Sequence, residues 1–182
     1  MTTPDGPSLR LGAWGGPSPV LADGRPRVVW TETFADGSDA LLVHDGALLV
    51  WPTVAACTAW VYARTGRDED ARPEVAEPVD VDVTRRWVAR VGAPPPAAAL
   101  LDVWNLATDV ATTLALPLGD RGRVSDRLHA MLTAAVLPQY FPRAPARVTW
   151  TPYELDRLRE RALRNARLVA WALDAGRAPA GS

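Results

Sequence analysis

Four polar side chains stand three and four residues apart in an otherwise apolar stretch, "LLDVWNLATDVATTLAL" (100–116): Asp102, Asn105, Asp109 and Thr112. On an α-helix this spacing places the four side chains along one edge. Two carboxyl groups about 10 Å apart along such an edge are within the range of a catalytic acid–base pair, provided that another element supplies a third group. The chemistry that these residue types offer is therefore either carboxylate catalysis or polar recognition.

Three interpretations of this edge are open. The edge is the solvated side of a core helix, whose carboxylates hydrogen-bond to loops or pair with Arg121, Arg123 or Arg127; it is a surface for a protein partner; or it is a carboxylate-based catalytic site. Catalysis ranks last, because neither a nucleophile nor a base can be placed beside the carboxylates from the sequence.

Other chemically active residues occur without the spacing that their chemistry needs. The two histidines, His44 and His129, form no HExxH or HxH motif, so a metal site would need carboxylates alone. Cys57 lies in a predicted amphipathic helix, where we expect a small buried thiol. GxSxG and phosphate-binding glycine motifs are missing from the sequence. We predict no catalytic residue, no metal and no cofactor.

The composition is that of one globular domain: 182 residues, 48% of them hydrophobic and 23% charged. A net charge of −1 and a pI near 6.1 argue against nucleic-acid binding. The sequence has neither a run of roughly 18 apolar residues nor a signal-peptide pattern, and its only cysteine is Cys57. We expect a cytoplasmic protein that binds neither nucleic acid nor membrane.

All basic residues are arginine, and alanine, proline and valine are abundant. This composition indicates a GC-rich, actinobacterial genome, so an arginine here is not evidence of phosphate binding. The arginines of the last helix alternate with Asp156 and Glu160, and we interpret them as a solvated face: Arg157, Arg161, Arg164 and Arg167.

The predicted fold class is α+β, with a small three-stranded antiparallel meander packed against four or five helices. Residues 1–26 are predicted to be an irregular arm, 27–176 a single domain and 177–182 a short tail. The strands are 27–34, 40–44 and 47–51, with a hairpin turn at Asp45-Gly46. Helices are expected at 52–66, 83–91 (capped by Asp82), 97–116, 124–137 and from a capping box at Thr151–Glu154 to Gly176.

The strands at 40–44 and 47–51 are apolar at consecutive positions, so both of their faces need cover. One face would be covered by the predicted helices, and the other by the N-terminal arm, another helix or a second protein chain. A homodimer is therefore one possible state.

Three motifs resemble a pattern in small bacterial proteins: WNLxxD at 104–109, DRL at 126–128 with Leu-Pro at 137–138, and WTxxE at 150–154. The matching residues are Trp104, Asn105, Leu106, Asp109, Asp126, Leu128, Pro138, Trp150 and Glu154. Some proteins with this pattern resemble immunity proteins of contact-dependent or polymorphic toxin systems. The resemblance spans residues 40–173 and implies a toxin-binding protein. It departs at "AMLTAAV" (130–136), where a glycine-asparagine turn is expected before Leu-Pro.

The predicted function is thus non-enzymatic protein binding, of the kind shown by an immunity or antitoxin protein that occludes a cationic toxin site. The candidate contact residues are the edge residues Asp102, Asn105 and Asp109 and the acidic loop Asp68, Glu69 and Asp70. The alternatives are a small enzyme with a carboxylate site near Asp102 and Asp109, and a homodimeric structural protein.

Overall fold

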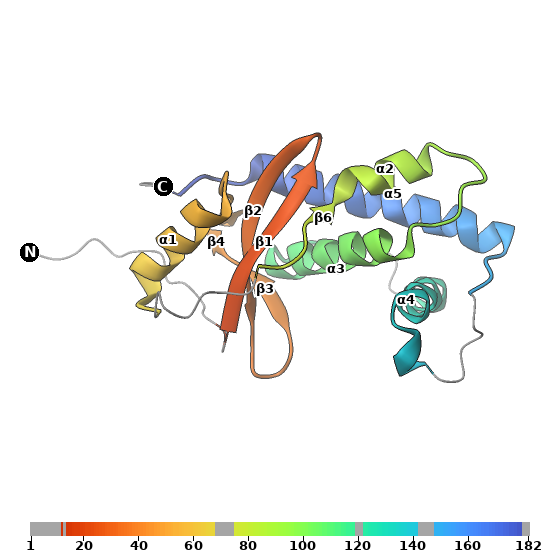
Figure 1. The fold of residues 1–182 in the computed structure, drawn as a ribbon, viewed down its shortest axis with the longest axis horizontal. Coiled ribbons are helices and arrows are strands. Elements are labelled where there is room, and N and C mark those ends of the chain that lie inside the picture. Colours follow the sequence, from red (N-terminus) through yellow and green to blue (C-terminus); the bar gives the residue numbers. More distant parts are fainter. Residues whose placement is uncertain (1–11, 13, 68–74, 119–121, 142–147, 180–182) are drawn as a thin grey trace, which may run out of the picture.

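A computed structural model of the chain describes residue 12 and residues 14–67, 75–118, 122–141 and 148–179. The protein is α+β, as predicted (Figure 1). Its elements are β1 (Trp14–Ala22), β2 (Arg25–Thr33), β3 (Asp39–Leu41), β4 (Val43–His44), β5 (Ala47–Leu48), α1 (Val54–Thr65), β6 (Val79–Asp80), α2 (Val81–Val88), α3 (Ala97–Thr113), α4 (Arg123–Val136), the 3-10 helix η1 (Pro138–Tyr140) and α5 (Pro152–Ala175).

The first strand corrects the prediction that residues 1–26 form an irregular arm, because β1 begins at Trp14 and pairs with β2 along its whole length. Its sequence, "WGGPSPVLA", is poor in strand-forming residues. The two-residue turn at Asp23-Gly24 sets a register in which the backbone nitrogens of Pro17 and Pro19 point away from β2. The hairpin therefore forms despite the prolines, because the missing N–H groups are not needed on that side.

The strands after β2 also differ from the predicted meander. The main sheet has four strands in the order β3-β2-β1-β6, with β6 parallel to β1, and β4 and β5 form a separate two-stranded sheet. The chain then turns back, so that Trp51 bridges to Val28 of β2. The predicted hairpin turn is confirmed, since Asp45 and Gly46 have φ values of 50° and 74°.

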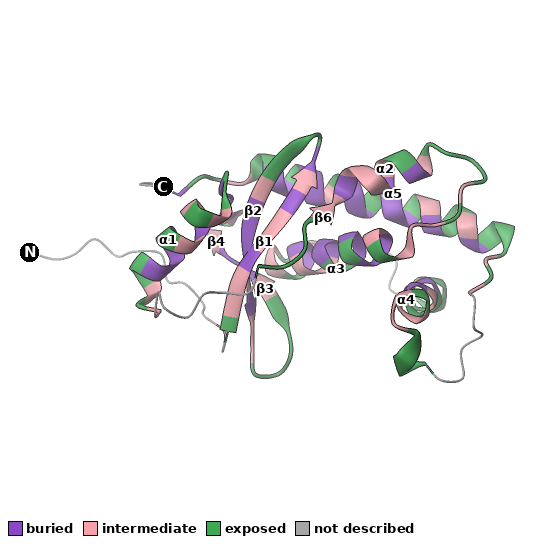
Figure 2. Ribbon diagram, in the orientation of Figure 1, coloured by how far each residue is buried: buried purple, intermediate pink, exposed green. Residues whose placement is uncertain are grey.

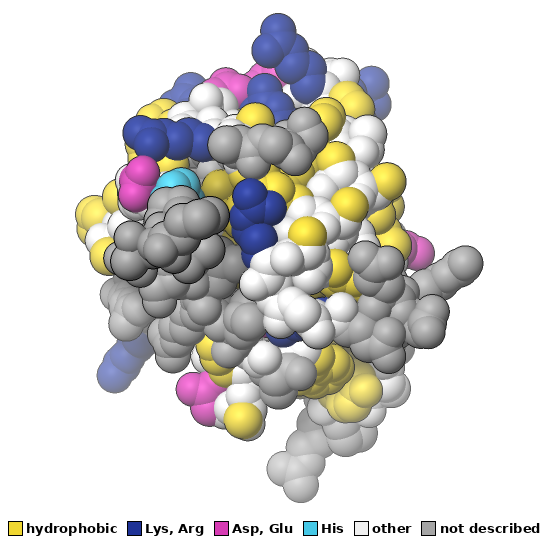
Figure 3. Space-filling model, turned by 90° about the vertical axis from the view of Figure 1, so that its left-hand side faces the viewer, with side chains coloured by type: hydrophobic (Ala, Val, Ile, Leu, Met, Phe, Trp, Pro, Cys, Tyr) yellow, Lys and Arg dark blue, Asp and Glu magenta, His cyan; other side chains and the backbone are white. Residues whose placement is uncertain are grey.

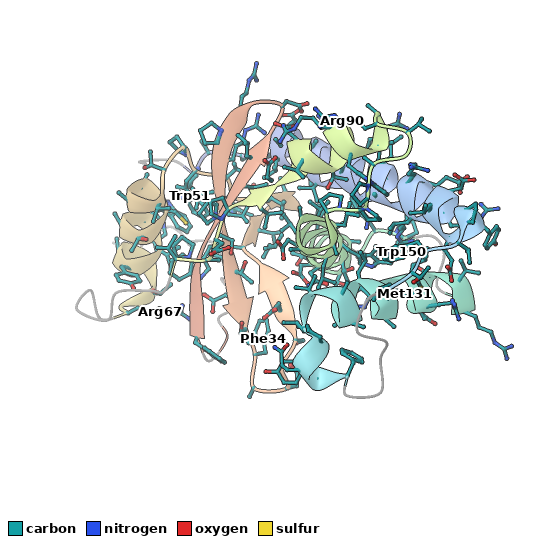
Figure 4. The ribbon with its side chains drawn as sticks, turned by 45° about the vertical axis from the view of Figure 1, so that its right-hand side comes forward. Phe34, Trp51, Arg67, Arg90, Met131 and Trp150 are labelled. Carbon is teal, nitrogen blue, oxygen red and sulfur yellow. The ribbon has the colours of Figure 1, made fainter. Side chains whose placement is uncertain are left out.

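Apolar side chains on alternate positions of these strands enter two different cores. One core lies toward α3 and α5 and includes Val29, Leu41, Leu48 and Val50. The other lies toward α1 and includes Val28, Trp30, Leu42, Leu49 and Trp51. Figure 4 shows Trp51 between the sheet and α1. The second sheet face is thus covered by a helix of the same chain, and this face does not require a second protein chain as cover.

The four later helices pack around a third core, at the end of the molecule away from α1 (Figure 1). Its members come from α2, α3, α4 and α5 and include Trp87, Leu100, Trp104, Leu128 and Leu158. Figure 2 shows the buried residues of α3 and α5 on their facing sides. Within the described part of the chain, none of the helices combines the length and apolarity that crossing a membrane requires.

Two helix starts test the capping residues that the sequence predicted. The predicted capping box is confirmed: the Glu154 backbone N–H donates to Thr151 Oγ1 at 3.2 Å and the Thr151 N–H donates to Glu154 Oε2 at 2.9 Å. The cap predicted at Asp82 is wrong, because Asp80 caps α2 two residues earlier. The Asp82 carboxylate instead accepts the backbone N–H groups of Asp23 and Gly24, and so holds the β1–β2 turn against α2.

A buried carboxylate ties three distant segments together. Glu32 of β2 is only 1% exposed and accepts hydrogen bonds from Trp30 Nε1 at 2.6 Å, the Gly12 N–H at 2.9 Å and Arg67 Nη2 at 2.7 Å. Burying a charge is costly unless it is paired and hydrogen-bonded, and these donors provide both. The Glu32 carboxylate therefore has a structural role, because its oxygens already accept hydrogen bonds from these three donors.

This arrangement predicts that Gly15→Ala destabilises the protein. A Cβ at position 15 would lie 2.6 Å from Trp30 Nε1, 2.8 Å from the Thr31 carbonyl oxygen and 2.9 Å from Glu32 Cδ. We expect the free energy of unfolding, measured by urea denaturation, to fall by about 1–3 kcal/mol. Gly122→Ala is the control, because a Cβ there meets open space and should change stability by less than about 0.5 kcal/mol. Equal stabilities for the two variants would contradict the close packing at Gly15.

Candidate functional site

The polar edge predicted from the sequence lies on one side of α3, between the sheet and α4. We call Asp102, Asn105, Asp109 and Thr112 the α3 face. Asp102, Asn105 and Thr112 are exposed, and Asp109 is partly buried. The remaining sides of α3 are held by buried apolar residues that pack against the sheet, α4 and α5. This packing leaves α3 no freedom to turn its carboxylates elsewhere.

Both carboxylates of the α3 face have raised pKa values. Burial, and then the negative charge of Asp39, raise the pKa of Asp109 to about 7. Burial, and then the negative charge of Glu77, raise the pKa of Asp102. Two distant segments, at β3 and just before β6, thus bring like charges to α3, which makes the ionised state of these carboxylates less favourable.

No cation among the described residues offsets this charge. Neither Asp102 nor Asp109 forms an ion pair or a side-chain hydrogen bond with another residue in the described ranges. Of the arginines considered as partners, Arg127 binds Glu154, with 2.7 Å between Nε and Oε1, and Arg123 lies at a cavity described below. Arg121 lies outside the described residues. The proposed pairing is therefore not found for Arg123 and Arg127.

The structure places His129 of α4 beside the α3 face, which the sequence could not do. His129 Nε2 lies 3.3 Å from Asn105 Oδ1, and its ring packs edge-on against Trp104 with 5.5 Å between ring centroids. Burial lowers the pKa of His129, although the charge of Asp126 opposes this shift. His129 is consequently neutral at neutral pH and supplies no positive charge to the α3 face.

The carboxylates Asp39 and Glu77 are the members of this site that the sequence analysis missed. Asp39 is exposed at the start of β3, where its Oδ1 accepts a hydrogen bond from Thr33 Oγ1 at 2.6 Å. Asp39 begins the three-residue strand β3, Glu77 lies just before the two-residue strand β6, and neither belongs to a recognisable motif. Only the packing of α3 against β3 and β6 brings them near Asp109 and Asp102. Local sequence signals do not predict this packing of α3 against β3 and β6.

The other residues considered from the sequence behave as structural groups. Burial raises the pKa of the Cys57 thiol to about 12, so this residue is a poor nucleophile. His44 lies at the β4–β5 turn, 3.6 Å from Asp45. Within the described ranges, no group of three or more His, Cys, Asp or Glu residues is arranged to hold a metal ion. The acidic loop Asp68, Glu69 and Asp70 lies outside the described residues, so its role stays a prediction.

The largest departure from the predicted surface is at α5. Arg157 does pair with Glu160, with 2.7 Å between Nη1 and Oε2, as its i,i+3 spacing predicted. Arg161, however, is buried, and Arg161 and Arg164 line a cavity of about 340 Å³ between α5 and the first turn of α4. The predicted solvated arginine face is therefore wrong for part of α5.

Figure 3 shows the end of the molecule that carries α1. Hydrophobic side chains lie there between scattered arginines, and acidic side chains are few and separate among the described residues in view. The like charges around α3 are therefore not part of an even acidic coating of the surface.

No protein-family model, curated protein or solved structure matches this chain. The resemblance based on the WNL, DRL and WTxxE motifs stays a prediction.

The raised pKa of Asp109 predicts an unusual pH dependence of stability. The folded chain keeps this proton up to about pH 7, whereas the unfolded chain loses it near pH 4, so the contribution of Asp109 to stability falls as pH rises between these values. We expect Asp109→Asn to match the wild type at about pH 4 and to exceed it at pH 8 by on the order of 2 kcal/mol in urea denaturation.

Thr112→Ala is the control, because it changes the same face without removing a titrating group. Its stability should follow the wild-type pH profile. Parallel profiles for wild type and Asp109→Asn would show that Asp109 titrates normally.

Proposed function

We propose that the protein is a binding protein that recognises a cationic surface of a partner protein through the α3 face. The observation that carries this proposal is the pair of raised pKa values at Asp102 and Asp109, with no described cation bound to either carboxylate. A guanidinium group of a partner would supply the missing charge. Such a contact is both a charge-assisted hydrogen bond and a relief of like-charge repulsion.

The position of the α3 face supports protein recognition. The face lies on a helix held by core packing on its other sides, so its side chains are presented without a large loss of conformational freedom on binding. Asn105 and Thr112 add neutral hydrogen-bonding groups between and beside the carboxylates. The resemblance to immunity proteins adds a class of partner, namely a toxin whose active site is cationic and is blocked by this acidic surface.

A second candidate function, acid–base catalysis, is favoured by one observation, the pKa of about 7 at Asp109. A general acid or base works best with a pKa near the working pH. The 340 Å³ cavity, however, lies between α4 and α5, and neither Asp109 nor Asp102 lines it. Binding therefore explains the arrangement of the carboxylates better than catalysis does.

The test of the proposed function is capture of a partner from a lysate of the native host. We expect the tagged wild-type protein to retain one basic protein in stoichiometric amount, and Asp102→Asn/Asp109→Asn to lose it. Asp156→Asn/Asp174→Asn is the matched control, because it removes two negative charges from exposed positions on α5. Equal retention by all three proteins would exclude the α3 face as the contact, and retention of nothing would contradict the proposal itself.

The same proposal predicts proton release when the partner binds. At pH 7 Asp109 is about half protonated, and a partner arginine would lower its pKa, so roughly half a proton leaves per complex. Affinity should then rise by up to about tenfold between pH 6 and pH 8. Calorimetry of the purified complex in buffers of different ionisation enthalpy measures the released proton. A pH-independent affinity, equal to that of Asp109→Asn, would contradict a direct contact at Asp109.

A further inference from the structure

Asn105 lies between the two carboxylates of the α3 face, and only one end of its amide is engaged within the protein. Asn105 Oδ1 lies 3.3 Å from His129 Nε2. Within the described ranges this is the only hydrogen bond of the Asn105 side chain, and the residue is exposed. The Asn105 Nδ2 group carries two N–H donors, and it has no acceptor among these residues.

His129 is held beside Asn105 by the packing of α4. Its neighbours Leu128 and Leu132 are buried in the core that α2, α3, α4 and α5 share. The His129 ring itself packs edge-on against the buried Trp104, with 5.5 Å between ring centroids. The contact between His129 and Asn105 therefore joins two elements that are already fixed, and it does not depend on the arrival of a partner.

The charges of the α3 face orient the Asn105 amide. Asp102 lies three residues before Asn105 and Asp109 lies four residues after it, so both carboxylates are its neighbours on the helix surface. An amide is a dipole whose NH2 end is positive, and it turns in the field of the charges around it. Negative charge on either side favours the Nδ2 group on the carboxylate side and Oδ1 toward His129, which is the arrangement observed.

The direction of this hydrogen bond decides which ring nitrogen of His129 carries the proton. Burial lowers the pKa of His129 more than the charge of Asp126 raises it, so the ring is neutral at neutral pH. A neutral imidazole has one donor and one acceptor. Because Asn105 Oδ1 can only accept, His129 Nε2 is the donor and Nδ1 is the acceptor.

We infer that His129 is a positioning residue, which holds the Asn105 amide so that the α3 face presents a hydrogen-bond donor between two carboxylates. A partner that fits this order carries a hydrogen-bond acceptor between two cationic side chains. Two cations alone would leave the Nδ2 group without an acceptor once the contact excludes water, and this weakens binding. The inference rests on the proposed function, because it specifies the partner of the same face.

The spacing of the carboxylates sets the form of a suitable probe. Asp102 and Asp109 are seven residues apart, which is about 10 Å along the helix axis. Arginines at positions i and i+7 of a second, antiparallel helix have the same separation, and its position i+4 lies opposite Asn105. The backbone carbonyl groups of a helix are used within the helix, so the central acceptor must be a side chain and can be varied alone.

The first measurement uses the free full-length protein with ¹⁵N-labelled histidine. Long-range proton–nitrogen NMR spectra at about pH 8, where the ring is neutral, distinguish a proton on Nε2 from a proton on Nδ1. We expect the Nε2–H form for His129, and a mixture of both forms in Asn105→Ala, because the ring then loses its acceptor. His44 is the only other histidine, so His44→Gln assigns the signals. An Nδ1–H form in the wild type would overturn the inference, whatever partner the face binds.

The second measurement titrates two alanine-rich helical peptides into the protein by calorimetry. Both peptides carry arginine at i and i+7, and position i+4 is either glutamate γ-methyl ester, an acceptor, or norleucine, whose side chain has no polar atom. We expect the wild type to bind the ester peptide about fivefold more tightly, which is the effect of one hydrogen bond. Asn105→Ala and His129→Leu should lose this preference, whereas His129→Gln should keep it, because its amide still donates to Asn105.

The possible results separate this inference from the proposed function. If the wild type binds both peptides equally and Asp102→Asn/Asp109→Asn binds neither, the inference is overturned and the α3 face remains a site for cations. Loss of the preference in His129→Gln as well as in His129→Leu would also overturn the positioning role. If the wild type binds neither peptide, the α3 face does not recognise paired cations, and the proposed function fails together with the inference.

Discussion

The two-sided apolar character of the central strands is the constraint on which the rest of the structure depends. Val28 and Trp30 point toward α1, whereas Val29 between them points toward α3 and α5, and the segments at 41–42 and 48–51 alternate in the same way. A sheet of this kind is stable only when both faces are covered. The helix α1 supplies one cover, and α3 with α5 supplies the other.

This constraint also explains why a polar helix edge becomes electrostatically unusual. Because α3 covers the sheet, it lies close to β3 and to the segment before β6, which carry Asp39 and Glu77. The carboxylates of α3 are therefore partly desolvated and beside like charges as a result of packing. The neighbouring Trp104 of the same helix instead meets a cation, because the guanidinium carbon of Arg161 lies 4.9 Å from its ring centroid.

The sequence predicted features whose signals are local. The Asp45-Gly46 turn and the Thr151–Glu154 capping box were correct because a few neighbouring residues determine each of them. The strand β1 was missed because glycine and proline disfavour a strand, and only pairing with β2 overrides that preference. The charges near Asp102 and Asp109, and the cavity at α5, arise where segments distant in sequence meet. The spacing of residues along one helix does not predict which distant segments will pack against it.

The contact between Arg177 and the short strand β5 has a consequence for how the chain folds. The Arg177 N–H donates to the Leu48 carbonyl oxygen, and the Val50 N–H donates to the Arg177 carbonyl oxygen, so residues far apart in the sequence share backbone hydrogen bonds. During synthesis, the segment around Leu48 leaves the ribosome long before Arg177 does. Until then the backbone groups of Leu48 and Val50 lack these partners, so this part of the fold is completed only after α5 has been made.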